Sequence, residues 1–145
     1  MEVKYASHCS YLIRYHMVFV LKYRKNLISA EISDAIKEIL LGISERYYLM
    51  FQAVGHTQDH LHILVEAAPR YSPSDVMQIC KSITAKQLFK KFPDLEEGLW
   101  GGHFCSEGGH IDTVGDGYDV KAMEEYIRKQ GISKSQMKLY QFASP

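Results

Sequence analysis

The chain has 145 residues, with 17 basic and 17 acidic side chains and therefore no net charge. Its hydrophobic fraction of 46% and charged fraction of 23% are those of an ordinary globular domain, which excludes disordered and fibrous proteins. A chain of this length buries enough surface to hold one core without disulfides. We therefore expect a single domain over residues 1–145, with a core at about 8–131 and a tail at 132–145.

The sequence predicts neither a membrane span nor a secretory signal. Its longest unbroken apolar run, Met17 to Leu21, is far too short to cross a bilayer, and the N-terminal residues lack an apolar signal core. The three cysteines, Cys9, Cys80 and Cys105, are odd in number and widely spaced. This pattern favours reduced thiols in a cytoplasmic protein with no membrane partner.

The first half of the chain predicts three strands and one helix. Residues 8–21 are rich in Tyr, Val, Ile and Phe and indicate a strand. Ser29 is placed to begin a helix, because apolar residues then recur at helical spacing as far as Tyr47. Residues 49–56 and 60–66 indicate two further strands, and the three residues between them suit a tight hairpin.

The second half predicts two helices separated by a loop and two short strands. Ser72, followed by proline, begins a helix whose apolar face continues to Phe92. Residues 93–102 indicate a loop, and residues 103–115 two short strands around a Gly-Gly turn. A third helix is expected over residues 119–130, with Asp at its start and Gly just beyond its end.

The predicted order is strand, helix, strand, strand, helix, strand, strand, helix. Hairpins mixed with helices indicate an α+β fold with a largely antiparallel sheet. The arrangement that fits best is the split βαβ of ferredoxin-like and RRM-like domains, with helices packed on the sheet.

Basic residues are unevenly distributed although the net charge is zero. Between Val76 and Phe92 there are four lysines and no acid. A local basic face on a neutral protein can contact phosphates, although a solvated helix face explains the pattern equally well. The candidate DNA-contacting residues are Lys22, Arg24, Lys25, Lys81, Lys86, Lys90 and Lys91.

The sharpest local pattern is the pair His60 and His62 in a predicted strand. Side chains alternate along a strand, so both imidazoles point the same way, about 6.6 Å apart along the chain. They can converge on one metal ion, while two half-exposed sheet histidines are the plainer interpretation. Glu66 lies on the same strand face and can support a metal ligand, although a surface acid at a strand end is more typical.

A second pattern lies on the predicted last helix, where Tyr126 and Gln130 are four residues apart and share one side. They flank an apolar stripe made by Val120, Met123 and Ile127. A tyrosine at such a border is usually a packed aromatic with its hydroxyl in water. The helix alone does not single out Tyr126 among ten tyrosines.

A third candidate is a zinc site formed by His103, Cys105 and His110 with the distant Cys9. The spacing matches no closed structural zinc pattern such as paired Cys-x-x-Cys knuckles. Loop residues with sheet-facing aromatics account for this stretch better.

Together, a His-hydrophobic-His strand and a C-terminal Tyr-x-x-x-Gln helix resemble the HUH-type single-tyrosine transposases of small insertion sequences, which act on single-stranded DNA. The resemblance covers roughly residues 8–131 in the right order. Matching segments are Tyr15–Val18, Lys22–Lys25, Gly55–His56, Asp59–His62, Lys81–Ala85, Leu99–Trp100, Thr113–Gly115 and Tyr126–Gln130. The stretch Gly101–Gly109 departs from the pattern, since it contains Gly and His where a plain aromatic strand is expected.

The resemblance implies a mechanism. Tyr126 would attack a phosphodiester, leaving a 5′-phosphotyrosine link and a free 3′-hydroxyl, so that a second strand transfer needs no ATP. His60, His62 and Gln130 would hold a divalent metal, magnesium or manganese, that polarises the scissile phosphate. Ligand softness alone favours manganese or zinc for two imidazoles and an amide.

The resemblance also implies the setting of the enzyme. The C-terminal helix would carry the nucleophile, and the partners would be single-stranded DNA with hairpin ends and a second copy of the chain. The protein would be cytoplasmic in a prokaryote and associated with the nucleoid. A host-adopted relative that processes repeated chromosomal hairpins fits the same residues as a mobile-element transposase.

Two other function classes remain open from the residues alone. One is a metal-dependent nuclease or hydrolase in which the same histidines activate water and Tyr126 is structural. The other is a ferredoxin-like nucleic-acid-binding module that stacks bases on Tyr11, Tyr15 and Phe51 without chemistry. A covalent protein–DNA adduct distinguishes the transposase from both.

Overall fold

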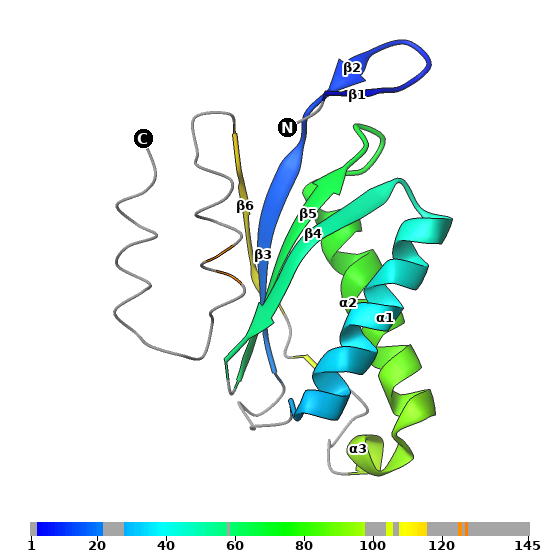
Figure 1. Ribbon diagram of the computed structural model, residues 1–145, viewed down its shortest axis with the longest axis vertical. Helices are drawn as coiled ribbons and strands as arrows, with labels where there is room; N and C mark the ends of the chain where they lie inside the picture. Colours follow the sequence, from blue (N-terminus) through cyan, green and yellow to red (C-terminus); the bar gives the residue numbers. More distant parts are fainter. Residues whose placement is uncertain are drawn as a thin grey trace.

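The computed structural model describes residues 3–21, 28–57, 59–97, 104–105, 108–115, 125 and 127. Most of this part forms two layers, a four-stranded sheet and two long helices packed on one of its faces (Figure 1). The main elements are β3 (Arg14–Val20), α1 (Ala30–Arg46), β4 (Leu49–His56), β5 (His60–Ala67), α2 (Pro73–Lys91) and β6 (His110–Thr113).

The strand order of the sheet is β4-β5-β3-β6, and every neighbouring pair is antiparallel. The connection through α1 joins β3 to β4 and passes over β5, while the connection through α2 joins β5 to β6 and passes over β3. Each βαβ unit is thus split by a strand of the other, so the predicted α+β fold with an antiparallel sheet is confirmed.

The strand predicted over residues 8–21 is interrupted. Its first part, β2 (Ser10–Tyr11), pairs with β1 (Lys4–Tyr5) in a separate two-stranded sheet, and β3 begins at Arg14. The cause is the length of the partner strand. Since β5 ends at Ala67, whose N–H donates to the Ile13 carbonyl at 2.9 Å, residues before Ile13 have no neighbour in the main sheet.

The prediction for residues 93–102 was wrong at its start, because the chain forms a short helix, α3 (Pro93–Glu97). Proline is well suited to the first position of a helix, where its missing N–H is not needed. Of the two strands expected within 103–115, the described residues contain β6 and a single bridge between Leu21 and Cys105.

Both long helices begin at the predicted serines. The Ser29 hydroxyl accepts the N–H of Ile32 at 3.2 Å. At the start of α2 the Ser72 hydroxyl accepts the N–H of Asp75, and the Asp75 carboxylate accepts the N–H of Ser72, each at 3.1 Å. This reciprocal capping satisfies N–H groups that the first turn of a helix leaves without partners.

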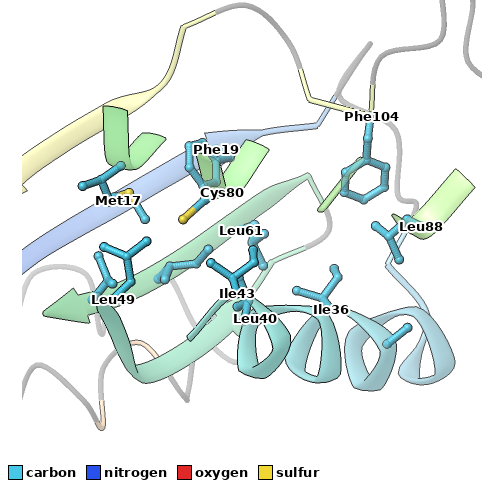
Figure 2. Close-up of a cluster of buried hydrophobic side chains, with 14 of the residues drawn as sticks. Met17, Phe19, Ile36, Leu40, Ile43, Leu49, Leu61, Cys80, Leu88 and Phe104 are labelled. Carbon is cyan, nitrogen blue, oxygen red and sulfur yellow. The ribbon is translucent and has the colours of Figure 1, made fainter. Parts of the chain in front are cut away.

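The core lies between the sheet and the two helices (Figure 2). Alternate residues of β3 and β5, including Met17, Phe19 and Leu61, pack there against apolar side chains of α1 and α2 such as Leu40 and Leu88. The other residues of these strands therefore face the opposite side of the sheet.

Two sequence expectations concern the chain as a whole. All three cysteines are free, as predicted. Within the described ranges no helix is both long enough and apolar enough to span a bilayer.

Candidate active site on the histidine face of the sheet

The sheet face away from α1 and α2 gathers polar side chains from three neighbouring strands, and we call it the histidine face. Its polar members are Arg14 and His16 on β3, His60, His62 and Glu66 on β5, and His110 and Asp112 on β6. The strand register brings them together, because Val18 lies opposite both His62 and His110, and His16 lies opposite Asp112. Residues directly opposite in a ladder point to the same face.

His60 and His62 point to the same face, as the alternation of the strand predicts. Their ring centroids are 6.4 Å apart, with the planes tilted by 32°. His60 Nδ1 lies 2.6 Å from the Oδ1 carboxylate oxygen of Asp59. Because a carboxylate only accepts hydrogen bonds, this contact places a proton on Nδ1 of a neutral His60 and the lone pair on Nε2.

His16 is a site residue that the sequence did not single out. Its Nε2 lies 3.2 Å from Nδ1 of His62, and the two rings are nearly parallel, with their planes 16° apart and their centroids separated by 5.5 Å. Each side chain is only 5% exposed. The one signal in the sequence is a histidine inside an otherwise apolar strand, and the register that brings it to His62 is not visible there.

Burial keeps the imidazoles of His16 and His62 neutral at pH 7. The pKa of His62 is lowered to about 3, chiefly by burial and to a smaller extent by the neighbouring His16 and His60. The pKa of His16 is also lowered, chiefly by burial, with the Asp112 carboxylate acting in the opposite direction. A neutral imidazole keeps a lone pair, which is the form that binds a metal.

This donor set fits one side of a divalent metal site. His60 and His62 offer two imidazoles from a rigid strand, and Asp59 supports the first of them in the way that carboxylates commonly support metal-bound histidines. The described part of the chain contains no cluster of three or more His, Cys, Asp or Glu side chains arranged for a metal. Gln130, the third ligand that the sequence predicts, lies outside the described residues.

The zinc alternative is not supported where it can be checked. Cys9, Cys105 and His110 are all described, and they belong to no cluster of three or more His, Cys, Asp or Glu side chains arranged for a metal. His103 lies outside the described residues.

Glu66 is buried, with 5% of its surface exposed, so the interpretation as a surface acid was wrong. The amide of Gln52 donates to its carboxylate at 3.4 Å, and Arg14 lies directly opposite it in the ladder. Arg14 is itself 2% exposed. The Glu66 carboxylate is therefore hydrogen-bonded to Gln52 on β4, and not to one of the histidines that Glu66 was expected to support.

Tyr126, the predicted nucleophile, lies outside the described residues, as do Lys22, Arg24 and Lys25. The predicted third helix is described at two positions, Glu125 and Ile127, and both are helical. Ile127 is fully buried and Glu125 is exposed, as the predicted apolar stripe requires. This part of the chain, orange in Figure 1, lies on the side of the sheet away from α1 and α2, which is the side of the histidine face.

The candidate lysines of α2 lie in the helix layer, across the sheet from the histidines. Two of them have partners within the chain: Lys81 donates to the Gly108 carbonyl at 2.7 Å, and Lys91 pairs with Glu38 at 3.3 Å. Lys86 and Lys90 are exposed. Their contact with DNA stays a prediction.

Comparison with known sequences points to one family. The sequence model of the family described as IS200-like transposases matches residues 9–130, which is most of the chain. The transposase TnpA of ISDra2 from Deinococcus radiodurans is 29% identical over 130 residues, covering 90% of this chain and 92% of that protein. The transposase of insertion sequence IS200 from Salmonella typhimurium is 29% identical over 129 residues, covering 89% and 84%.

Solved structures show the same fold. A crystal structure of a Deinococcus radiodurans R1 protein assigned as a transposase superposes with a TM-score of 0.70 at 27% identity, covering 88% of this chain and 98% of that one. A REP-associated tyrosine transposase bound to a REP hairpin superposes with a TM-score of 0.55 at 12% identity, covering 88% and 70%. At that identity the second likeness concerns the fold alone.

Proposed function

Because the chain belongs to the family of IS200-like transposases, we propose that it cleaves and rejoins single-stranded DNA through a tyrosine–DNA intermediate. The observation that carries this proposal is the histidine face. There, two imidazoles of one strand are both held at Nδ1 by neighbouring side chains. A helical segment from the C-terminal end of the chain lies on the same side of the sheet.

In the proposed reaction the Tyr126 hydroxyl attacks the scissile phosphorus. A bond forms between the phenolic oxygen and phosphorus, and the bond from phosphorus to the 3′ oxygen breaks. The phenol releases its proton, the departing 3′ oxygen takes one up, and the 5′ end stays linked to the protein. The number of phosphoester bonds is unchanged, so a 3′-hydroxyl can reverse the step on another DNA end.

To use Tyr126 as a nucleophile, the protein must stabilise a phenolate that is rarely populated in water at neutral pH. A tyrosine with a pKa of about 10 is ionised in roughly one molecule in a thousand at pH 7, a difference of about 4 kcal/mol. A divalent ion, magnesium or manganese, held by His60, His62 and Gln130 would supply Lewis-acid stabilisation of the charge that develops on the phosphate. The fixed orientation of both histidines and the neutral state of His62 are this chain's own contribution to such a site.

We further propose that the substrate is single-stranded DNA with hairpin ends and that the active enzyme is a homodimer. A fold neighbour was solved with a REP hairpin bound, which supports a hairpin as a ligand class for this fold. The same likeness keeps open the host-adopted function in processing chromosomal hairpins.

The non-catalytic binding module is the weaker alternative. Of its three stacking aromatics, Tyr15 is 7% exposed and belongs to the core beneath the helices. Phe51 packs against the same core and is half-buried. A base cannot stack on a ring that is covered by helices. The binding-module hypothesis therefore loses two of the three aromatic rings on which bases would stack.

The test is formation of a covalent adduct. Labelled single-stranded DNA carrying the element ends is incubated with protein and manganese and run on a denaturing protein gel. Wild type should give a labelled protein band, and Tyr126→Phe should bind DNA but give no band. Tyr48→Phe changes an exposed tyrosine between α1 and β4, and as the matched control it should behave as wild type. Cleavage without any adduct would favour the hydrolase, and an adduct on Tyr126→Phe would move the nucleophile elsewhere.

The metal role has its own test. His60→Ala with His62→Ala should abolish metal-dependent cleavage and weaken manganese binding measured by calorimetry. Gln130→Ala should have a milder effect, because water or a substrate oxygen can replace a neutral amide ligand. Cleavage by wild type at full rate in excess chelator would contradict the role of the metal.

A further inference from the structure

His60 and His62 each have another side chain in contact with the Nδ1 atom of the ring. Asp59 contacts Nδ1 of His60 at 2.6 Å, and His16 contacts Nδ1 of His62 at 3.2 Å. The first contact is between neighbours in sequence, but the second joins β3 to β5 and exists only because of the strand register. The fold has therefore brought a third imidazole to the pair.

The direction of the contact between His16 and His62 follows from the next residue. Oδ1 of Asp112, on β6, lies 3.4 Å from Nδ1 of His16. The negative carboxylate favours a proton on that nitrogen, and a neutral His16 then has its lone pair on Nε2. Since Nε2 of His16 faces Nδ1 of His62, His62 must donate from Nδ1 and carry its own lone pair on Nε2.

Packing alone does not explain an imidazole at this position. His16 is 5% exposed, and burying a polar ring is unfavourable unless it is hydrogen-bonded. A leucine would fill the space in β3 without that cost. The carboxylate, imidazole and imidazole lie in sequence across three adjacent strands, β6, β3 and β5, and this is the arrangement that orients metal-bound histidines from behind.

We propose that His16 is a positioning residue that fixes His62 in the tautomer with its Nε2 lone pair available for the divalent ion, and that Asp112 sets the direction of this contact. The part of the inference that concerns the ion rests on the proposed function. The part that concerns the tautomer of His62 stands on the contacts alone, so the two can fail separately.

The experiment uses full-length, metal-free protein labelled with 15N at histidine. Two-bond nitrogen–proton correlations identify which ring nitrogen of each histidine carries the proton. His62 should carry it on Nδ1 in wild type and in His16→Gln, because the glutamine oxygen can accept where Nε2 of His16 does. His16→Leu removes the acceptor, so His62 should shift towards the other tautomer.

The control is His110→Gln. His110 also contacts Asp112, with Nε2 3.6 Å from Oδ2, but it is exposed and contacts the carboxylate oxygen that His16 does not. Its replacement should leave the His62 tautomer unchanged. Should His16→Leu not fold, Asp112→Ala decides, because Asp112 is 44% exposed and its loss should let His16, and with it His62, populate both tautomers.

A second readout is manganese affinity measured by calorimetry. His16→Leu should weaken binding by about 10- to 100-fold, the usual effect of removing a supporting partner of a metal ligand, and His16→Gln should restore most of it. If His62 keeps the Nδ1 proton in His16→Leu and in Asp112→Ala, the inference is wrong. If His62 follows His16 but wild type binds no manganese, the positioning contact stands and the metal role in the proposed function fails.

Discussion

His62 is the side chain in which the site and the stability of the fold conflict most directly. It is buried on the histidine face beside two other imidazoles, and its pKa is lowered from 6.5 to about 3. The folded protein therefore holds it neutral, as a metal ligand must be. The unfolded chain has no such constraint and takes up a proton near pH 6.5.

This difference predicts a loss of stability in mild acid. A histidine with a lowered folded pKa binds its proton in the unfolded state first, so stability falls as the pH drops from about 6.5 towards 3. Between pH 7.5 and 5.5, His62 alone should lower the free energy of unfolding by about 1.4 kcal/mol. Urea denaturation of metal-free protein at both pH values measures this. His62→Gln should lose less stability over the interval, whereas His8→Gln, at an exposed position, should match wild type.

At position 109 the backbone conformation and the space available require glycine. Its φ is +145°, and an added Cβ would come within 2.8 Å of Met77 Cε and 2.9 Å of the Val18 carbonyl oxygen. The strand β6, which carries Asp112, begins at the next residue. A side chain at position 109 would therefore push this strand away from β3.

Two glycine-to-alanine changes should have opposite signs. Gly109→Ala should destabilise the protein by about 1–3 kcal/mol, from backbone strain and the contact with the carbonyl. Gly42→Ala, inside α1 with open space around the added methyl, should stabilise it by about 0.5–1 kcal/mol. Urea denaturation of both variants provides the test. Equal effects of the two changes would show that strand β6 adjusts freely around position 109.

How far the site could be predicted depends on whether its geometry is local. His60 and His62 share a face because strand alternation is a property of the sequence itself. His16 and Asp112 join them only through the pairing of three strands, and that register is set by the whole sheet. Glu66 was placed on the correct face, but its burial depends on what covers that face, which no local pattern reports.

At the scale of elements, the starts of the two long helices agree with the sequence predictions more closely than the bounds of the strands do. Ser29 and Ser72 begin α1 and α2 because a hydroxyl can satisfy nearby N–H groups wherever the helix lies. The strand expected over 8–21 breaks at Ile13 because β5 ends opposite it, a cause distant in sequence. The composition of residues 93–102 predicts a loop, but Pro93 is at a favourable first position and begins the short helix α3.

The layer arrangement sharpens the prediction for the basic face of α2. Lys86 and Lys90 are exposed on the helix layer. A DNA strand bound at the histidine face would therefore reach them only by passing around the edge of the sheet. If they contact phosphates, replacing both with alanine should lower affinity for all single-stranded sequences and reduce the salt slope by about 1.4.

Fluorescence anisotropy over a range of salt concentrations measures that slope. The control is Lys37→Ala with Arg46→Ala, which removes the same charge from exposed positions of α1. If both double variants and wild type show the same salt dependence of DNA affinity, Lys86 and Lys90 do not contact phosphates.

At the scale of the whole molecule, the open question is which chain's histidines Tyr126 serves. Two glycines in the sequence after β6, at positions 115 and 117, suggest a hinge or exchange arm before the last helix, although an ordinary tight turn is the plainer interpretation. Gly115 has open space around an added Cβ, so sterics at that position do not demand glycine. Ile127 is fully buried within one chain. An exchanged helix would bury the same apolar face against its partner's sheet, so this burial is compatible with both arrangements.

We predict that the enzyme is a homodimer with active sites shared between subunits, and mixing two inactive variants tests this. Tyr126→Phe lacks the nucleophile, and His60→Ala with His62→Ala lacks the metal ligands. In a heterodimer with shared sites, one site combines the intact tyrosine with the intact histidines, so cleavage returns and the DNA adduct forms only on the histidine-variant chain. If each site lies within one subunit, every site keeps one defect. Proven heterodimers without cleavage would then exclude sharing but leave the tyrosine chemistry intact.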